Sequence, residues 1–389
     1  ADGTLDRAVL TGSPRGLVNI ARLSTETPER VELEGLGPLT LTRGATADLL
    51  LGGPATLTLT STGVVLRAKD LVEGHVAADG SRGSLLAKGD VVMTRGGEEL
   101  QSEDIELLYA TTTAPAERLR FISRGRTSLS GRTPQGELVV ARAQGGLQGT
   151  VGEQNLRVST AREVRMELGQ PPTLVAQARL LRAFDAAART LEASGDVLVE
   201  SPQGVGTADE LSVRGPEEVE LRGTPGRPAR WQTKLAGSAK PDSSAANYRA
   251  VAEAEFIKAQ PQRLEARGAV VAQVVTQKGA LDLTSGVFVV ALADPGVERA
   301  LVVTAEHTVH AVVGRDAEQV VLDADYLRLD GRMVIIDDQE VAIGDEVVAQ
   351  RGVRVAWQGA QLFEGAGERF WMHRDGRMRL DAPLGGRLL

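Results

Sequence analysis

The residues of this chain with the greatest chemical potential are four histidines, several adjacent carboxylates and a few glycine-rich segments. His307 and His310 are close enough in sequence to suggest a metal site. On a regular strand, however, a spacing of three places two side chains on opposite faces, so these rings could not share an ion. The 389 residues include no cysteine, which excludes thiolate metal sites, cysteine nucleophiles and disulfides. We expect no metal and no cofactor.

Carboxylates occur as adjacent pairs at 98–99, 217–218 and 337–338. Neighbouring residues lie on opposite faces of a strand or in turns, whereas a glycosidase needs two carboxyl groups that converge within roughly 5–10 Å. The glycine-rich segment 145–149 lacks the Lys-Ser/Thr of a phosphate-binding loop, so we interpret it as a turn. The sequence therefore predicts a protein that is not an enzyme.

The charge of the chain also restricts its partners. With 44 basic and 52 acidic residues the formal net charge is −8, whereas nucleic-acid binders carry a basic stripe, so we expect no nucleic acid. No apolar run approaches the length of a membrane-spanning helix. The chain shows no signal peptide and starts within the strand pattern, so we interpret it as a trimmed or mature chain.

A short phrase recurs along the sequence: a glycine, an alternating apolar run, a turn and a second alternating run. It is clearest at 88–107 and 194–213, and weaker copies begin at 54, 124, 267 and 351. The equivalent positions 55, 89, 125, 195 and 268 lie 34, 36, 70 and 73 residues apart. A period of about 35 residues indicates stacked supersecondary units, and alternation with period two makes each unit a pair of β-strands.

The remaining patterns support this assignment. Residues 39–42, 55–60 and 219–222 alternate strictly, and glycine-containing turns are predicted at 95–97, 202–204, 330–332 and 375–377. Segments 173–192 and 245–259 have helical propensity but fall where the period expects strands, and we assign them as strands. We predict repeats over 1–236, a polar loop or linker at 237–247, and further repeats over 248–389 that either continue the first array or form a second β-domain.

Three consecutive phrases carry a resemblance to a known family. Gly195-Asp196-Val197-Leu198-Val199 is followed by Ala208-Asp209-Glu210-Leu211 and then by Val219-Glu220-Leu221-Arg222-Gly223-Thr224-Pro225. Residues 324–329 give an aromatic version of the second phrase, and residues 8–14 repeat the third. This order resembles the OstA-like family of lipopolysaccharide-transport bridge proteins, which includes LptA, LptC and the periplasmic part of LptD.

The resemblance implies an all-β fold, an elongated repeat array of antiparallel strands shaped as an OstA-like, LptA-like β-jellyroll (β-taco). It implies a non-enzymatic periplasmic carrier or bridge, which shields the acyl chains of lipopolysaccharide or a related glycolipid in a hydrophobic groove between the inner and outer membranes. Membrane association would then come through a segment or partner outside this chain. The chain departs from the family in being about twice as long as a single bridge protein, and 145–190 and 285–320 fit the phrase poorly.

Strand parity selects the side chains that would line such a groove. In 196–200 the charged residues share a face with Leu198, which leaves Val197 and Val199 on the other face. The same rule selects fourteen candidate lipid-binding residues: Leu57, Leu59, Val91, Met93, Ile105, Leu107, Val197, Val199, Leu211, Val213, Val219, Leu221, Val353 and Val355. Trp357 follows on the same face as Val355, and we predict it to be in the core.

Two other readings stay open. The same side chains could close into a dry core, which would make the protein a structural β-solenoid scaffold or filament. A carbohydrate-active β-helix enzyme is the third reading. For the carrier, the strands near 5–10 and 370–380 are predicted edges at which the chain joins itself or another transport-bridge protein end to end by strand addition.

Overall fold

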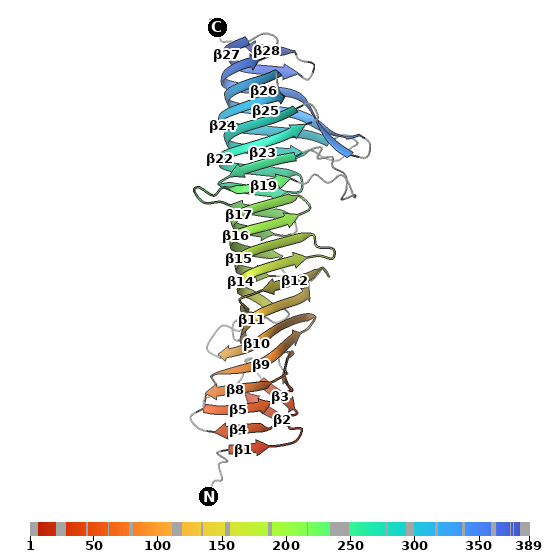
Figure 1. Ribbon diagram of the computed structural model, residues 1–389, viewed down its shortest axis with the longest axis vertical. Coiled ribbons are helices and arrows are strands. Elements are labelled where there is room, and N and C mark those ends of the chain that lie inside the picture. The colour runs from red at the N-terminus through yellow and green to blue at the C-terminus, as the bar shows by residue number, and fades with distance from the viewer. Residues whose placement is uncertain are drawn as a thin grey trace. The chain divides into compact units, whose positions relative to one another are not determined.

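The described part of the computed structural model is built from β-strands and contains no helix (Figure 1). The all-β prediction is confirmed, including for 174–185 and 249–260, where helical propensity competed. Since there is no helix in the described ranges, none has the length and apolar character to span a membrane. The structure describes residues 7–20, 29–43, 46–60, 62–77, 81–110, 119–133, 135–151, 156–185, 189–215, 217–233, 249–276, 279–292, 299–315, 318–336, 339–358, 363–373, 375 and 377–381.

The chain divides into two compact units, Ala1–Gly195 and Asp196–Leu389. The division falls within one strand, β16 (Thr190–Ser201). The predicted linker at 237–247 lies outside the described residues. Each unit is described separately below.

The strands of the first unit before β16 are β1 (Arg7–Leu10), β2 (Arg15–Ile20), β3 (Glu29–Gly35), β4 (Leu39–Arg43), β5 (Thr46–Gly52), β6 (Ala55–Leu59), β7 (Val64–Ala68), β8 (Leu71–Ala77), β9 (Arg82–Arg95), β10 (Glu98–Ala110), β11 (Leu119–Arg132), β12 (Leu138–Ala143), β13 (Leu147–Val151), β14 (Leu156–Leu168) and β15 (Leu174–Asp185).

After β16, the second unit contains β17 (Gly204–Arg214), β18 (Glu218–Arg222), β19 (Ala229–Thr233), β20 (Arg249–Ala254), β21 (Phe256–Gln260), β22 (Arg263–Thr276), β23 (Gly279–Leu292), β24 (Arg299–Arg315), β25 (Glu318–Ile336), β26 (Gln339–Gln358), β27 (Phe363–His373) and β28 (Met378–Asp381).

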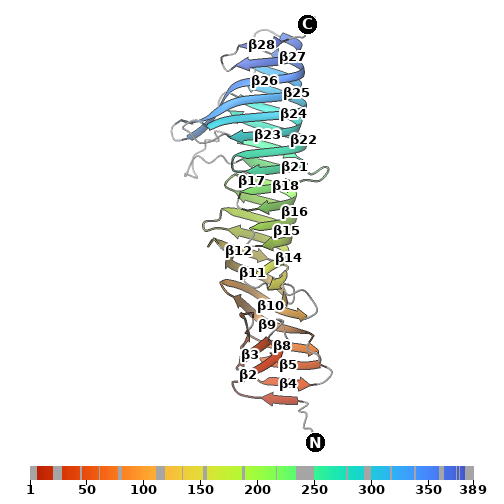
Figure 2. The same ribbon diagram turned by 180° about the vertical axis from the view of Figure 1, so that it is seen from behind.

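In the first unit antiparallel pairing produces two layers. Layer A begins with β1, β4, β5 and β8, which are stacked in that order in Figures 1 and 2. It continues with β13, with the first halves of β9, β11 and β14, and with the second halves of β10 and β15. Layer B joins β2, β3, β6, β7 and β12 to the complementary halves of the same long strands. Each long strand therefore contributes one half to each layer.

The second unit repeats this arrangement. Layer C contains β19, β20, the first halves of β17, β23, β25 and β27, and the second halves of β22, β24 and β26. Layer D contains β18, β21, β28 and the complementary halves. The two layers meet directly, since a Cβ added to Gly206 of layer C would be 2.5 Å from Leu221 Cδ1 of layer D.

The recurrent glycines lie where the chain passes from one layer to the other. Gly89 is in the middle of β9, with φ +83°, and the following Asp90 has φ +45°. The pairing register of β10 with β9 and β11 shifts between Ser102 and Asp104, at the same level. The phrase that we read as glycine followed by a strand is therefore a bend inside a longer strand. A glycine fits there because a side chain disfavours positive φ.

These bends stack along one edge of each unit, which we call the closed edge. In the first unit the Gly53 amide donates to Asp70 O (2.6 Å) and the Lys69 amide donates to Gly89 O (2.8 Å). At the opposite edge, the free edge, short hairpins such as 95–98 and 168–174 join neighbouring strands of the same layer. Each unit is thus a pair of sheets hinged along one edge.

One predicted turn is wrong. Residues 330–332 lie inside β25, where Gly331 pairs with Leu301 on one side and with Gly344 on the other. A register shift between Asp330 and Gly331 accommodates the glycine without ending the strand. A single Asp-Gly-Arg sequence is compatible with either a turn or an irregular strand, and the pairing with both neighbours decides between them.

Candidate functional site

All fourteen residues selected by strand parity are buried between the layers. None is more than 3% exposed, and the members are Leu57, Leu59, Val91, Met93, Ile105, Leu107, Val197, Val199, Leu211, Val213, Val219, Leu221, Val353 and Val355. Leu198, between two of them, is 38% exposed. The structure brings the first six together inside the first unit and the last eight inside the second. Their role in lipid binding stays a prediction.

The interior is mainly aliphatic, with a few aromatic rings that the sequence did not single out. Trp231, Phe121, Phe288 and Phe370 are at most 1% exposed. Trp231 packs on glycine, since a Cβ at Gly204 would come within 2.7 Å of its ring. Glycine at alternate positions of one strand, 204 and 206, is a local signal for such a close approach.

Trp357, predicted to be in the core, is only half-buried. It lies at the end of β26, where its backbone pairs with Val320 on one side and Phe363 on the other. Strand parity therefore did not predict how deeply this ring is buried. Trp371, which the sequence left unassigned, donates from Nε1 to Glu346 and stacks on the His373 ring with centroids 5.7 Å apart.

A chain of buried hydroxyl groups crosses the closed edge of the first unit. Ser102 Oγ lies 2.9 Å from Thr127 Oγ1 and donates to Arg124 O at 2.8 Å. Thr127 Oγ1 donates to Ser123 Oγ at 3.0 Å, and Ser123 Oγ accepts from the Leu147 amide at 2.7 Å. These hydroxyls supply partners for backbone groups that the strand bends release. No sequence pattern identified them, because each serine or threonine alone is an ordinary strand residue.

The closed edge of the second unit carries a charged cluster beside a hollow of about 510 Å³. Arg227 Nη2 lies 2.6 Å from Asp196 Oδ1, and Nη1 lies 3.4 Å from Asp209 Oδ1. The hydrogen bond to Asp196, and then the attraction of Asp209, raise the pKa of the Arg227 guanidinium. The Gly-Asp phrase at 195–196 and the Ala-Asp phrase at 208–209 therefore place two carboxylates around one arginine.

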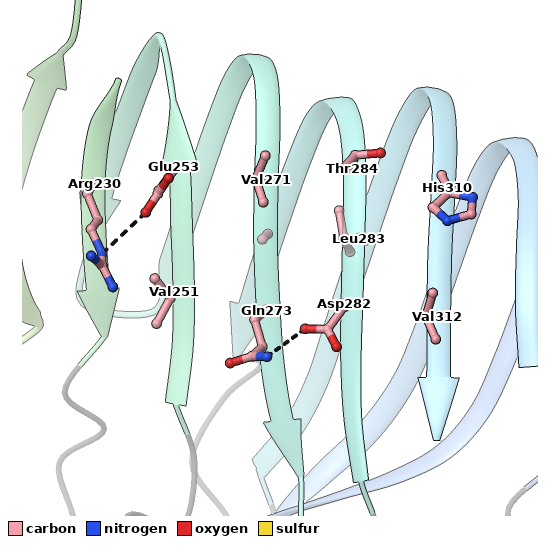
Figure 3. A pocket seen from close by; sticks show the side chains of 11 residues that line it. Arg230, Val251, Glu253, Val271, Gln273, Asp282, Leu283, Thr284, His310 and Val312 are labelled. Atoms are coloured by element: carbon pink, nitrogen blue, oxygen red, sulfur yellow. Dashed lines mark hydrogen bonds and ion pairs between the residues drawn. The ribbon is translucent and has the colours of Figure 1, made fainter. Parts of the chain in front are cut away.

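A groove of about 430 Å³ lies on the outer face of layer C (Figure 3). Its strands align Arg230, Glu253, Val271, Thr284 and His310 as successive cross-strand partners. Two pairs of its polar groups bind each other: Arg230 Nε is 3.5 Å from Glu253 Oε1, and the Gln273 amide donates to Asp282 Oδ1 at 2.6 Å. Val271 is 55% exposed in its floor.

The histidines lie on outer surfaces. His307 and Thr308 have φ +66° and +54°, and the register of β24 with β25 shifts between Glu306 and Val309. The assumption of a regular strand at this place is therefore wrong: both His307 and His310 are exposed. His310 Nδ1 lies 2.7 Å from Asp323 Oδ1. Among the described residues no group of three metal-ligating side chains converges.

No family model, curated protein sequence or solved structure matches this chain. The OstA-like resemblance consequently stays a prediction from the phrases themselves. The physical properties of the interior, which is apolar, lined from two layers and bounded by a free edge, are what any functional proposal must explain.

Proposed function

We propose that the protein is a non-enzymatic carrier that holds the acyl chains of an amphiphile, lipopolysaccharide or a related glycolipid, between its two layers. The observation that supports this proposal is the hinged pair of sheets in each unit, with aliphatic interior side chains such as Val199 and Leu211 and a free edge opposite the bends. The proposed location is the periplasm, between the inner and outer membranes.

The energetics favour such cargo. Burying a fourteen-carbon tail contributes on the order of 10 kcal/mol at about 0.8 kcal/mol per CH₂. The interior side chains are in contact and sealed from solvent, so the layers must part for a tail to enter. After entry, interior side chains that had contacted one another contact the acyl chain instead, and water stays excluded. The cost of uptake is therefore the rearrangement of the layers rather than wetting of the core.

A second function follows from the same burial. Interior side chains that are at most 3% exposed are equally compatible with a core that stays dry permanently. Such a core would make the protein a structural β-scaffold. The two functions differ in one respect: only the carrier exposes position 199 to a lipid at some stage of its cycle.

Lipid extraction and photocrosslinking distinguish them. We expect mass spectrometry of an organic extract of the purified protein to reveal a bound amphiphile. A benzophenone amino acid in place of Val199 should crosslink to it, whereas the same group in place of the outward-facing Leu198 should not. An empty extract, together with equal or absent crosslinking at both positions, would favour the scaffold.

We further propose that the chain joins itself or another transport-bridge protein by strand addition. Within the described residues β1 pairs with β4, and its Val9 and Leu10 are 50% and 47% exposed. At the other end of the sequence β28 pairs with β27. A concentration-dependent mass in light scattering, abolished by Val9→Pro, is expected; a strict monomer at all concentrations would contradict the proposal.

A further inference from the structure

One ion pair connects the two layers across the free edge of the first unit. Arg189 Nη2 lies 2.6 Å from Glu137 Oε2, and the two side chains are 16% and 32% exposed. The residues are far apart in sequence, on different hairpins. The carrier function proposed above assigns no role to this ion pair.

Glu137 is held on layer B by a tightly bonded turn between β11 and β12. The Thr133 amide donates to Glu137 O at 2.9 Å, and the Glu137 amide donates to Thr133 Oγ1 at 3.2 Å. The Gly136 amide donates to Thr133 O, and Arg132 Nη1 donates to Gly136 O, both at 2.8 Å. The carboxylate is therefore presented from a fixed position.

Arg189 belongs to layer A. It immediately precedes β16, and the second half of β15 pairs with the first half of β14 in layer A. A Cβ at Gly195 would lie 3.1 Å from the Cβ of Arg179, so β16 returns alongside β15. Arg189 thus starts its strand at the free edge of layer A, with φ +51°.

Two other ion pairs among the described residues of the first unit each stay within one layer. Arg124 and Glu106 lie on β11 and β10 in layer A, with Nη2 2.8 Å from Oε2. Arg142 and Glu167 lie on β12 and β14 in layer B, with Nη1 3.4 Å from Oε1. Such pairs reinforce one sheet, whereas the pair between 137 and 189 opposes separation of the two sheets.

The geometry of this pair leaves hydrogen-bonding capacity unused. The charged atoms are close, but their angles do not form a directed hydrogen bond, and Arg189 Nε is buried without an acceptor within the described structure. A guanidinium edge presenting Nε and Nη2 matches the two oxygens of a carboxylate or phosphate. An anionic group could therefore satisfy Arg189 better than Glu137 does.

We propose that Glu137 and Arg189 form a latch on the free edge of the first unit, and that the anionic head group of an entering amphiphile opens it by taking Arg189 from Glu137. The second clause rests on the proposed carrier function. The first clause is a property of the protein alone and is tested without lipid.

The chain has no cysteine, so spin labels attach only where cysteine is introduced. We choose Gln135→Cys on layer B and Ala183→Cys on layer A, both at exposed positions. Pulsed electron paramagnetic resonance should give a narrow distance distribution that broadens to longer distances with Arg189→Gln. The charge swap Glu137→Arg with Arg189→Glu should restore the narrow distribution, and the matched control Arg124→Gln should leave it unchanged.

Oleate and its methyl ester then test the head-group clause. We expect oleate to lengthen the distance at about tenfold lower concentration than methyl oleate, and Arg189→Gln to remove this preference.

An unchanged distance distribution with Arg189→Gln would overturn the latch and leave the carrier proposal standing. Broadening by Arg189→Gln without any response to either lipid, together with an empty lipid extract, would sustain the latch and overturn the carrier. Equal responses to oleate and its ester would overturn the head-group clause.

Discussion

The carboxylate of Asp70 lies against the α-carbon of Gly89, in the space that a Cβ would occupy. The same relationship recurs between Glu103 and Gly125. In the second unit, Glu255 Oε2 would lie 2.5 Å from a Cβ on Gly268. At these three bends an acidic residue therefore covers the glycine of the next long strand, whereas Gly195 lies against Arg179 instead.

Gly89→Ala should consequently destabilise the protein by about 1–3 kcal/mol, because it combines a positive φ with a clash against Asp70. Gly97→Ala is the control, since a Cβ there meets no atom within 4 Å and its φ is not positive. Urea denaturation of both variants measures the difference. Equal stability of the two variants would show that the bend does not require glycine.

The loss of folding stability caused by truncating an apolar side chain should increase with the burial of that side chain. Leu57→Ala, at a side chain with 0% exposure, is expected to cost about 2–5 kcal/mol. Leu50→Ala removes the same atoms from a side chain that is 46% exposed and should cost much less. Denaturation midpoints of the two variants give the comparison. A Leu57→Ala variant as stable as Leu50→Ala would mean that this part of the interior is not packed in solution.

Ser123→Ala should destabilise the first unit by about 1–3 kcal/mol, because it removes the acceptor of the buried Leu147 amide and the partner of Thr127 Oγ1. Ser128→Ala, on the outer side of the same strand, should change stability by less than about 0.5 kcal/mol. Hydrogen exchange at the Leu147 amide provides a local readout, and unchanged protection in Ser123→Ala would contradict the assignment.

The His75–Asp48 pair predicts a pH dependence. The hydrogen bond between His75 Nδ1 and Asp48 Oδ1 (2.9 Å) raises the pKa of His75 above its ordinary 6.5 and lowers the pKa of Asp48 below its ordinary 3.8. The histidine contribution to stability is complete below 6.5 and is lost as pH rises through the raised pKa. The aspartate contribution is complete above 3.8 and is lost as pH falls through the lowered pKa.

His75→Gln should therefore lower the free energy of unfolding most between pH 3.8 and pH 6.5, the ordinary pKa values of the two groups, and less in alkaline solution. Urea denaturation across the pH range measures this effect. In an NMR titration, Asp48→Asn should lower the midpoint of His75. Asp90→Asn, whose carboxylate pairs with Lys69 instead, should leave that midpoint in place. A midpoint that Asp48→Asn does not move would exclude the proposed cause.

The sequence by itself determined the strands and which face of each strand is apolar. Alternation is a local property of extended backbone, so Val197 and Val199 were assigned inward and Leu198 outward without knowledge of any partner strand. The local glycine signal was real but ambiguous, because positive φ serves a turn and a mid-strand bend equally. Only pairing on both sides showed that Gly89 bends β9 instead of preceding a strand.

The tertiary structure alone decided which strands share a layer and which side chains meet between layers. Glu137 and Arg189 are ordinary charged residues on separate hairpins, and their contact exists because the bends fold one layer onto the other. The burial of Trp231 and the hydroxyl chain through Ser123 have the same origin. Such contacts depend on register and on the angle between sheets, which are set by the packing of many distant residues and leave no periodic trace in the sequence.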